Sequence, residues 1–288
     1  ISSFLTENGT NENPKILTVN LNKSFVGSFL YGKGFIFDDS SLADEESPGI
    51  PSPIKTYKKL IENVKNMEVI FPYIGGDEVS SKPDHSHHRY VIDFRDLSYD
   101  KCKEDYKEVL DLLEVKMKPY RTKLNSDGSY KLRSPLPQKW WIHADKRPAL
   151  YKAISHLKRV LVCTQTSKYT SFVFLESKKV FDQKLCVFSL DKYFQFSICQ
   201  SNFYLLWSYF FGGTLGGGHV YNSVDCFENF PFPDFMFSLN EIDEKSELCV
   251  EKLEVLGSQF YQLRSKIMIE SNIGITKFYN KFHSPKFQ

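Results

Sequence analysis

The spacing of hydrophobic residues changes along the chain, and this change limits the folds that the sequence can form. Residues 24–37 alternate glycine with aromatic residues, as short strands and turns do, and the short apolar stretches at 69–73 and 90–94 are typical of strands. Between Asp100 and Lys118, apolar residues instead recur at the spacing of one helix face: Tyr106, Val109, Leu110, Leu113 and Met117. Both periods within one chain predict an α+β domain with mixed strands and flanking helices.

Further elements are expected around these. A short helix is predicted at 55–63, and Pro119 is expected to end the helix of residues 100–118. Pro148 is expected to open another helix, because proline suits the first helical turn. Strands are then predicted at 160–163, 171–175 and 185–190.

The most apolar run of the chain, 194–211, predicts a buried segment with a helix near 202–211. It contains Gln195, Gln200 and Asn202, whose amides would be costly in lipid, so we do not expect a membrane span. The six cysteines form no CxxC pair, and no signal peptide opens the chain. These features predict reduced core thiols and a cytoplasmic protein.

The C-terminal segment has its own helical pattern. Within residues 240–272, apolar residues repeat at three- and four-residue intervals, at Leu253, Leu256, Phe260, Leu263 and Ile267. This stripe predicts a long amphipathic helix whose apolar face is buried, either on the preceding domain or on a neighbouring one.

The chain is expected to divide into three segments. Residues 1–54 contain short strands and an acidic, proline-rich loop at 38–53. Residues 55–235 are expected to form the main domain, and residues 236–288 a helical region.

One segment carries a strong charge asymmetry, although the net charge of the whole chain is only +2. Between residues 116 and 147, lysine and arginine greatly outnumber the two acids, Asp127 and Asp145, and aromatic residues are interleaved. This pattern is typical of a surface that follows DNA phosphates, although a solvated basic loop is an alternative. The predicted contacts are Lys116, Lys118, Arg121, Lys123, Arg133, Lys139, Trp140 and Trp141.

Two other segments are candidates for DNA contact. Arg89 follows the polar, histidine-rich loop 84–88, which has no matching Cys or His cluster for zinc and is expected to be a surface loop. The glycine-rich segment 212–219 lacks the Gly-Lys-Ser/Thr ending of a phosphate-binding loop. Its glycines allow either a flexible loop or close approach to DNA, with Gly213, Gly217 and His219 as contacts.

A nuclease is the main enzymatic alternative. Asp84, Glu114 and Lys116 have the order of a PD-(D/E)xK signature, in which two carboxylates hold a metal and lysine polarises water. Glu114 and Lys116 lie in the strongest helical pattern, however, where residues two apart diverge by about 200°. We therefore expect no metal site and no catalytic residue in this chain.

The segment Asn229-Phe230-Pro231-Phe232 is similar to the motif with which amino-methyltransferases hold their target, but it differs at the second position. No glycine-rich strand–turn–helix for S-adenosylmethionine accompanies it. We therefore expect a proline turn here and no cofactor in this chain.

An ordered series of short motifs resembles one protein family over nearly the whole chain. The series comprises 24–28 with 32–35, 71–79, 89–94, 115–119, Trp140-Trp141, 147–154, 227–233 and 274–285. It resembles the C-terminal part of MmeI-like single-chain restriction–modification enzymes and of related defence-system adenine methyltransferases. Where relatives have Gly-Glu-Asp or similar, this chain has Gly75-Gly76-Asp77-Glu78, so we expect Asp77 and Glu78 to be structural or interdomain.

This resemblance implies a target-recognition domain for double-stranded DNA, followed by a helical region. It also implies an N-terminal methyltransferase domain, and in some members a nuclease, in the same polypeptide. S-adenosylmethionine would be the cofactor of the full enzyme, which would modify adenine at N6 in a bacterial cytoplasm during phage defence. A protein-interaction module that uses the C-terminal helix, with no DNA role, is a further alternative.

Overall fold

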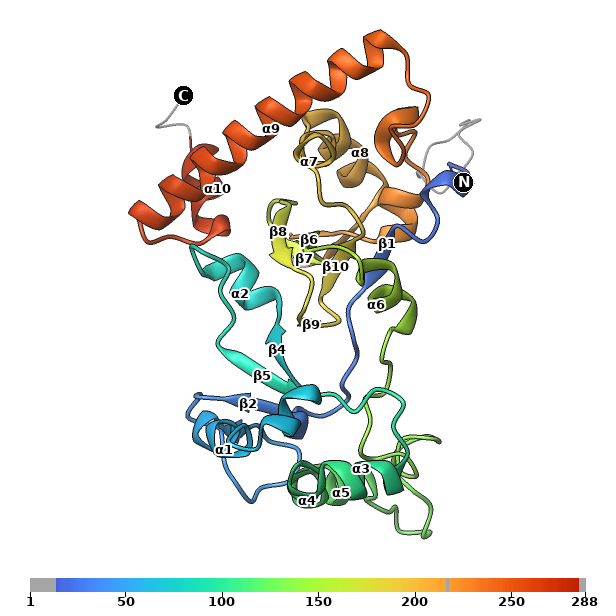
Figure 1. Ribbon diagram of the computed structural model, residues 1–288, viewed down its shortest axis with the longest axis vertical. Helices are drawn as coiled ribbons and strands as arrows, with labels where there is room; N and C mark the ends of the chain where they lie inside the picture. Colours follow the sequence, from blue (N-terminus) through green and yellow to red (C-terminus); the bar gives the residue numbers. More distant parts are fainter. Residues whose placement is uncertain (1–13, 216–217, 285–288) are drawn as a thin grey trace.

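The computed structural model describes residues 14–215 and 218–284, which form two lobes (Figure 1). The lower lobe holds a small sheet with short helices beneath it. The upper lobe holds a second sheet, with a long C-terminal helix above it. Helices and several sheets confirm the predicted α+β class; the part of the prediction that concerns residues 1–13 lies outside the described residues.

A five-stranded mixed sheet connects the two lobes. Its strands, in spatial order, are β3 (Ser52–Pro53), β2 (Ile36–Asp38), β5 (Arg89–Ile92), β4 (Ile70–Ile74) and β9 (Val180–Phe181). β5 is antiparallel to β2 and β4, whereas β9 is parallel to β4. Because β9 is part of the upper lobe, its pairing with β4 joins the lobes. β4 and β5 confirm two predicted strands.

Short helices complete the lower lobe and the connection to the upper one. They are α1 (Ile54–Leu60), α2 (Gly76–Ser81), α3 (Tyr99–Asp105), α4 (Lys107–Lys116) and α5 (Lys118–Arg121). The single helix predicted for 100–118 is broken, because the backbone leaves the helical region at Tyr106. Pro119 does not end a helix but lies in the first turn of α5, where its missing N–H costs nothing. The predicted apolar face of α4 is buried against the sheet.

The upper lobe is built on an antiparallel sheet that is covered on both faces. Its strands, in spatial order, are β1 (Ser24–Val26), β10 (Leu185–Phe188), β6 (Arg159–Thr164) and β8 (Val173–Glu176). Val160 and Val162 of β6 enter one core, while Leu161 and Cys163 enter the other. This alternation follows from the two-residue period of a strand, and it explains why these strands are apolar throughout.

The remaining elements surround this sheet. The helices are α6 (Pro148–Ile154), α7 (Tyr193–Cys199), α8 (Asn202–Phe211), α9 (Glu244–Glu270) and α10 (Ile275–Phe282). A small antiparallel sheet contains β7 (Thr166–Ser167), β11 (Gly213–Leu215) and β12 (Gly218–Val220). Short 3₁₀ or π turns are η1 (Thr18–Asn20), η2 (Lys33–Phe35), η3 (Val64–Glu68), η4 (Val224–Glu228) and η5 (Asp234–Met236). Among the described residues, no helix has the length and apolarity to cross a bilayer.

Helices α8 and α9 of the upper lobe are less buried than the sequence predicts. α8 buries Tyr204 and Ser208, but Phe203 and Leu206 are about 70% exposed, so the prediction of a buried helix is wrong. α9 packs on α7 through Gly257, where any Cβ would lie 2.3 Å from the Ser197 hydroxyl.

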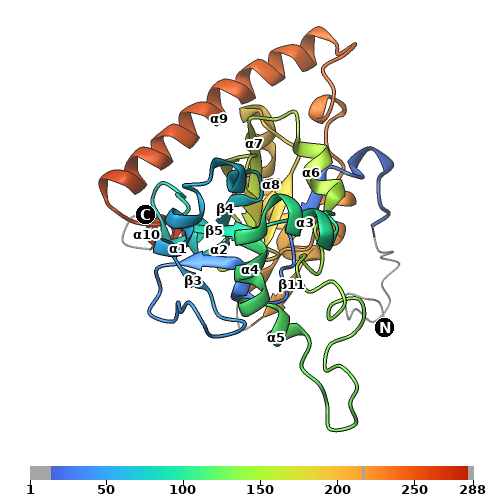
Figure 2. The ribbon, with the colours of Figure 1, turned by 60° about the horizontal axis from the view of Figure 1, so that its bottom comes forward.

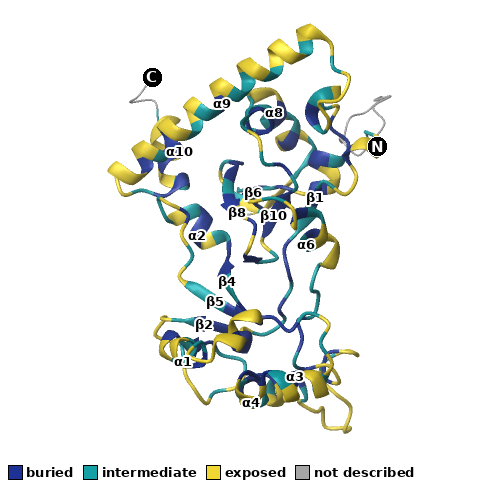
Figure 3. Cartoon of the chain, viewed as in Figure 1, coloured by how far each residue is buried: buried dark blue, intermediate teal, exposed yellow. Residues whose placement is uncertain are grey.

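The packed face of α9 continues through Arg264 and Met268, and not through the predicted apolar stripe. Within that stripe, Leu256 and Leu263 are 60% and 58% exposed. Figure 3 shows the exposed outer side of α9 along most of its length. Of the two covers expected for this stripe, the described part of the preceding domain therefore leaves Leu256 and Leu263 largely uncovered.

Candidate nucleic-acid interface

Two of the predicted DNA-binding cations, Lys116 and Arg121, are fully buried and bind the chain's own backbone. The Lys116 ammonium donates to the carbonyl oxygen of Asp44 at 2.5 Å. The Arg121 guanidinium donates to the carbonyl oxygens of Leu30 and Ile142, each at 2.5 Å. Burial lowers the pKa of Lys116, and it lowers the pKa of Arg121 to about 10. Neither side chain reaches solvent, so the prediction that they contact phosphates is wrong.

The tryptophan pair is also structural. Trp140 is buried in the core of the lower lobe, with its ring edge-on to Tyr99. The indole N–H of Trp141 donates to the carbonyl oxygen of Leu97 at 3.0 Å. Both rings are engaged in the fold, which corrects the prediction that they contact DNA.

Four further basic residues of this segment lie on an exposed loop, residues 122–139, which we call the basic loop. Lys123, Lys131, Arg133 and Lys139 are exposed, and none forms an ion pair with another described residue. The only acid of the loop, Asp127, accepts hydrogen bonds from the backbone and hydroxyl of Ser129. Figure 2 shows the loop extending away from the body of the molecule. This geometry leaves Lys123, Arg133 and Lys139 available to a polyanion.

Lys118, in the turn before this loop, is exposed but has partners. Its ammonium lies 3.4 Å from the Glu114 carboxylate and 5.4 Å from the centre of the Trp140 ring. Surface ion pairs of this kind are weak, so Lys118 can still contribute to a basic surface.

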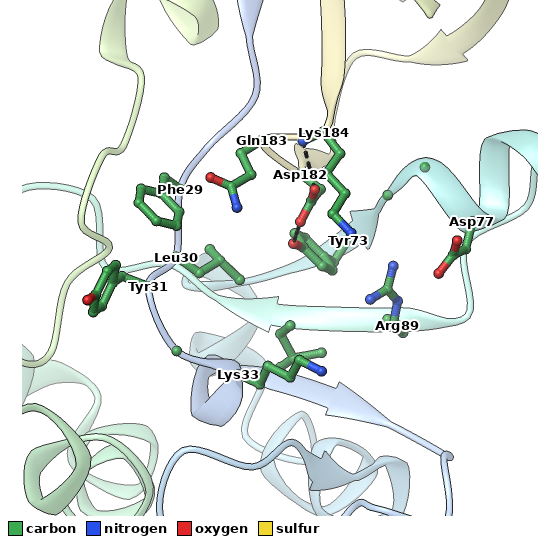
Figure 4. Close-up of a pocket in the computed structure, with 14 residues that line it drawn as sticks. Phe29, Leu30, Tyr31, Lys33, Tyr73, Asp77, Arg89, Asp182, Gln183 and Lys184 are labelled. Atoms are coloured by element: carbon green, nitrogen blue, oxygen red, sulfur yellow. Dashed lines mark hydrogen bonds between the residues drawn. The ribbon is translucent and has the colours of Figure 1, made fainter. Parts of the chain in front are cut away.

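A polar cleft of 290 Å³ lies where the two lobes meet (Figure 4). Lys33 of the lower lobe and Lys184 of the upper lobe lie on its two sides, both exposed and both without an ion-pair partner among the described residues. The Tyr73 hydroxyl donates to the Asp182 carboxylate in its wall. Burial, with the neighbouring Asp182, raises the pKa of Tyr73, which therefore stays protonated.

Arg89 lines the same cleft but is held by Glu78. Its guanidinium donates to the two carboxylate oxygens of Glu78 at 2.6 and 2.7 Å, and it lies 4.9 Å from the centre of the Tyr73 ring. Glu78 also accepts from the backbone N–H of Gly75 at 3.0 Å. Arg89 therefore fixes the cleft wall, and its charge is largely compensated; this corrects the prediction that it serves mainly as a DNA contact. The structural role expected for Glu78 agrees with these contacts.

Arg121 positions the lower wall of this cleft. Besides its bond to Leu30, its guanidinium donates to the carbonyl oxygen of Tyr31 at 3.3 Å. Leu30, Tyr31 and Lys33 all line the cleft. The buried arginine thus shapes a surface that it does not itself reach.

The glycine-rich segment forms a hairpin from β11 and β12. Gly213, Thr214 and Leu215 are exposed, whereas the predicted contact Gly217 lies outside the described residues. His219 is buried beside Tyr209, with ring centres 4.5 Å apart, and burial lowers the pKa of His219. Its ring leaves no room for a side chain at 212, because a Cβ there would lie 2.3 Å from the His219 Cε1 atom. His219 is thus a structural residue, contrary to prediction.

The hairpin and the cleft lie on one continuous edge. The backbone N–H of Gln165 donates to the carbonyl oxygen of Lys184 at 2.8 Å, and that of Tyr221 donates to the carbonyl oxygen of Gln165 at 2.7 Å. These bonds connect the 182–184 turn, β7 and β12 in series. Neither Lys33 nor Lys184 belongs to a charge cluster in the sequence, so only the fold reveals that they share a cleft.

The residues of the nuclease alternative do not form a metal site. Glu114 and Lys116 both lie on helix α4; the Glu114 carboxylate accepts from the Tyr99 hydroxyl at 2.8 Å, and Lys116 is buried. Asp84 lies in the loop after α2, where it accepts from the backbone of Ser86. Within residues 14–215 and 218–284, no group of three His, Cys, Asp or Glu side chains could hold a metal ion.

The segment that resembles a methyltransferase motif is part of the upper core. Asn229 is buried, and its side-chain oxygen accepts from the Trp207 indole at 3.2 Å. The Asn20 amide donates to the carbonyl oxygens of Phe227 and Phe230. These contacts leave Asn229 unavailable to a substrate.

A family model and a solved structure both relate this chain to the enzyme MmeI. The family model described as the MmeI target recognition domain matches residues 54–234. The structure is similar to that of the Type IIL restriction–modification enzyme MmeI, solved in complex with DNA, with a TM-score of 0.53 and 11% sequence identity. The match covers 92% of this chain but only 38% of the MmeI chain. No curated protein matches this chain in sequence.

Proposed function

Because this chain belongs to the family of MmeI target recognition domains, we propose that it recognises a specific sequence in double-stranded DNA as part of a larger restriction–modification enzyme. The observation that carries this proposal is the family match over residues 54–234, supported by a fold shared over 92% of the chain with an enzyme solved on DNA. This chain spans only 38% of that relative, so the other activities of the enzyme are assigned to further domains.

The exposed surfaces suggest two kinds of DNA contact, one to phosphates and one to bases. The basic loop, with Lys123, Arg133 and Lys139, is suited to phosphates, since its charges are solvated and uncompensated. The cleft and the β11–β12 hairpin present polar side chains and exposed backbone along one edge, which suits contact with base edges in the major groove. The loop leaves α5 beside the cleft, because Tyr120 of α5 lies against Gly32 in the cleft wall.

The finer part of the proposal concerns the reaction of the whole enzyme. We assign to it an N-terminal domain that methylates adenine at N6 with S-adenosylmethionine, with a nuclease in some relatives, acting in phage defence in a bacterial cytoplasm. The domain described here would hold the duplex while the target adenine is flipped out.

The residues of this chain do not fit the cofactor itself. Gly75 and Gly76 do connect strand β4 to helix α2, the order that nucleotide sites use. Their backbone is already occupied, however, since Glu78 accepts from the Gly75 N–H and a Cβ at Gly75 would lie 2.8 Å from the Arg89 guanidinium. The other glycine-rich segment is a hairpin. S-adenosylmethionine is therefore assigned to the methyltransferase domain, and this chain alone is not an enzyme in our proposal.

Salt-dependent DNA binding tests the proposal. We expect the purified chain to bind random duplexes at about 50 mM salt, with a log–log slope of roughly −0.9 per phosphate contact. The variant Lys123→Ala/Arg133→Ala/Lys139→Ala should flatten the slope by about 2 to 3 on all sequences. Fluorescence anisotropy of labelled duplexes measures both effects.

A matched control uses exposed cations of the same lobe. Lys58 and Lys59 lie on α1, on a different side of the lobe from the basic loop (Figures 1 and 2). Lys58→Ala/Lys59→Ala should leave the slope unchanged. Undetectable binding by the wild-type chain, or equal loss in both variants, would remove the basic loop as a DNA surface.

A further inference from the structure

The outer side of α9 carries an apolar strip with coiled-coil spacing. Leu253, Leu256, Phe260, Leu263 and Ile267 alternate at three- and four-residue intervals, which places them at successive a and d positions of heptads. The helix packs on α7 through a neighbouring face that contains Gly257, Arg264 and Met268. The strip therefore runs beside the packed face for about 22 Å, at 1.5 Å per residue. Leu256 and Leu263 are 60% and 58% exposed, and Phe260 and Ile267 are each 38% exposed. Leu253 is half-buried.

At its C-terminal end, the strip forms one wall of a groove. Phe260, Leu263 and Ile267 face Phe278 and Phe282 of α10 across an apolar hollow of 580 Å³. Phe282 is itself 58% exposed. A large apolar surface of this kind is unusual on a monomer, and it marks a contact site for another chain or domain.

The solvent-facing flank of the strip is basic. Lys245, Lys252 and Lys266 lie seven residues or multiples of seven apart, at the g positions beside the strip, with Gln259 at the remaining one. On α10, Lys281 lines the groove, and Lys277, one turn before it, is also exposed. Of these five lysines, Lys266 has a long pairing with Glu270, at 3.9 Å. A partner helix would thus meet apolar side chains between two rows of positive charge.

The lysines beside the strip favour an acidic helix over a second copy of this chain as the partner that covers it. If a second copy packed antiparallel on the strip, the g-position lysines of the two copies would face each other. If it packed parallel, the lysines of one copy would face the e positions of the other, which include Gly257 and Arg264 and no acidic residue. Both arrangements lack opposite charges, so self-association is disfavoured. A helix with acidic residues beside its apolar face complements both rows of lysine.

We infer that α9 and α10 form a docking site for an acidic amphipathic helix with apolar residues at three- and four-residue spacing, which packs along α9 as in a coiled coil. The charge complementarity and the groove at the α10 end both support this occupant. The inference does not depend on DNA binding, because the site involves neither the basic loop nor the cleft.

Two synthetic helices test this inference. Both have about 21 residues, three heptads with leucine at a and d; one carries glutamate and the other lysine at e and g. The glutamate peptide should bind the full chain, with an affinity that falls as salt rises, and at least about tenfold more tightly than the lysine peptide. Lys252→Glu/Lys266→Glu should reverse that preference.

Two substitutions at equally exposed residues of α9 test whether the peptide binds on the apolar strip. Leu263 and Ile269 are both 58% exposed on α9, but only Leu263 lies on the strip and in the groove. Leu263→Asp should weaken glutamate-peptide binding by about tenfold or more, the scale of a central interface residue, whereas Ile269→Asp should leave it within twofold. Failure of the glutamate peptide to bind, binding of the lysine peptide with equal or higher affinity, or equal effects of the two variants overturns the inference. So does a wild-type dimer, in sedimentation, that Leu263→Asp dissociates.

Discussion

Helices α4 and α9 carry the same kind of apolar pattern but place it in opposite environments. In α4, the periodic residues Val109, Leu110 and Leu113 are buried against the lower sheet. In α9, the periodic residues Leu256 and Leu263 are mostly exposed, and the helix packs through a different face.

The difference shows what an apolar stripe determines. Periodicity predicts that a helix forms and that its stripe avoids water in the working protein. It does not specify whether the covering surface belongs to the same chain. The lower sheet covers the apolar face of α4, whereas the described residues cover α9 mainly on the side of α7.

The largest expected effect is the loss of stability when a charge is placed in the buried stripe. Leu113→Asp would put an unpaired carboxylate into a fully buried site, and we expect it to cost about 4 kcal/mol or more in the free energy of unfolding. Leu263→Asp, in the exposed stripe, should change it by no more than about 0.5 kcal/mol. Urea denaturation of both variants gives the comparison, and similar losses would show that the two stripes do not differ.

A second contrast lies within the basic segment. Arg121→Ala would leave the carbonyl oxygens of Leu30 and Ile142 without donors in the core, and we expect a loss of about 3 kcal/mol. Arg133→Ala removes an exposed guanidinium and should cost no more than about 0.5 kcal/mol. Thermal melts monitored by circular dichroism measure both; an unchanged midpoint for Arg121→Ala would mean that its backbone contacts contribute little.

A smaller effect tests which face of α9 packs. In an exposed helix, Gly→Ala gains about 1 kcal/mol, because alanine is the better helix former. At Gly257 the added Cβ would lie 2.3 Å from the Ser197 hydroxyl and 2.4 Å from the Tyr193 carbonyl oxygen. Overpacking costs about 1–3 kcal/mol, so the expected net change is a loss of about 1 kcal/mol. A gain, measured by urea denaturation, would show that α9 does not pack closely on α7.

Much of the fold could be predicted from local patterns. The strands β4, β5, β6 and β10 and the helices α1, α6 and α9 lie where alternation, helical spacing and proline indicate them. The break at Tyr106 and the exposure of α8 could not be predicted, because both depend on which tertiary contacts form. The pairing of β4 with β9, about a hundred residues apart, has no local signal either.

The candidate interface was predicted only in part, for the same reason. Charge counting treats Lys116 and Lys123 alike, yet one is bound to the carbonyl oxygen of Asp44 and the other is solvated. Burial of a cation depends on backbone carbonyls brought from distant segments, which no spacing rule describes. Conversely, Lys33 and Lys184 stand alone in the sequence, and the fold brings both to one cleft.

The cleft lysine Lys184 provides the smallest expected effect on stability, and it tests whether an exposed cation of the cleft contacts DNA. Lys184→Ala should leave stability unchanged, since its side chain is exposed and unpaired among the described residues. If Lys184 contacts a phosphate, the salt slope of DNA binding should flatten by about 0.9 on every duplex. If it contacts a base edge, binding to the cognate site should weaken by about 1–3 kcal/mol, with little change elsewhere. Lys58→Ala on α1 is the control with equal charge loss; equal binding by wild type and Lys184→Ala on all duplexes would place the cleft outside the DNA interface.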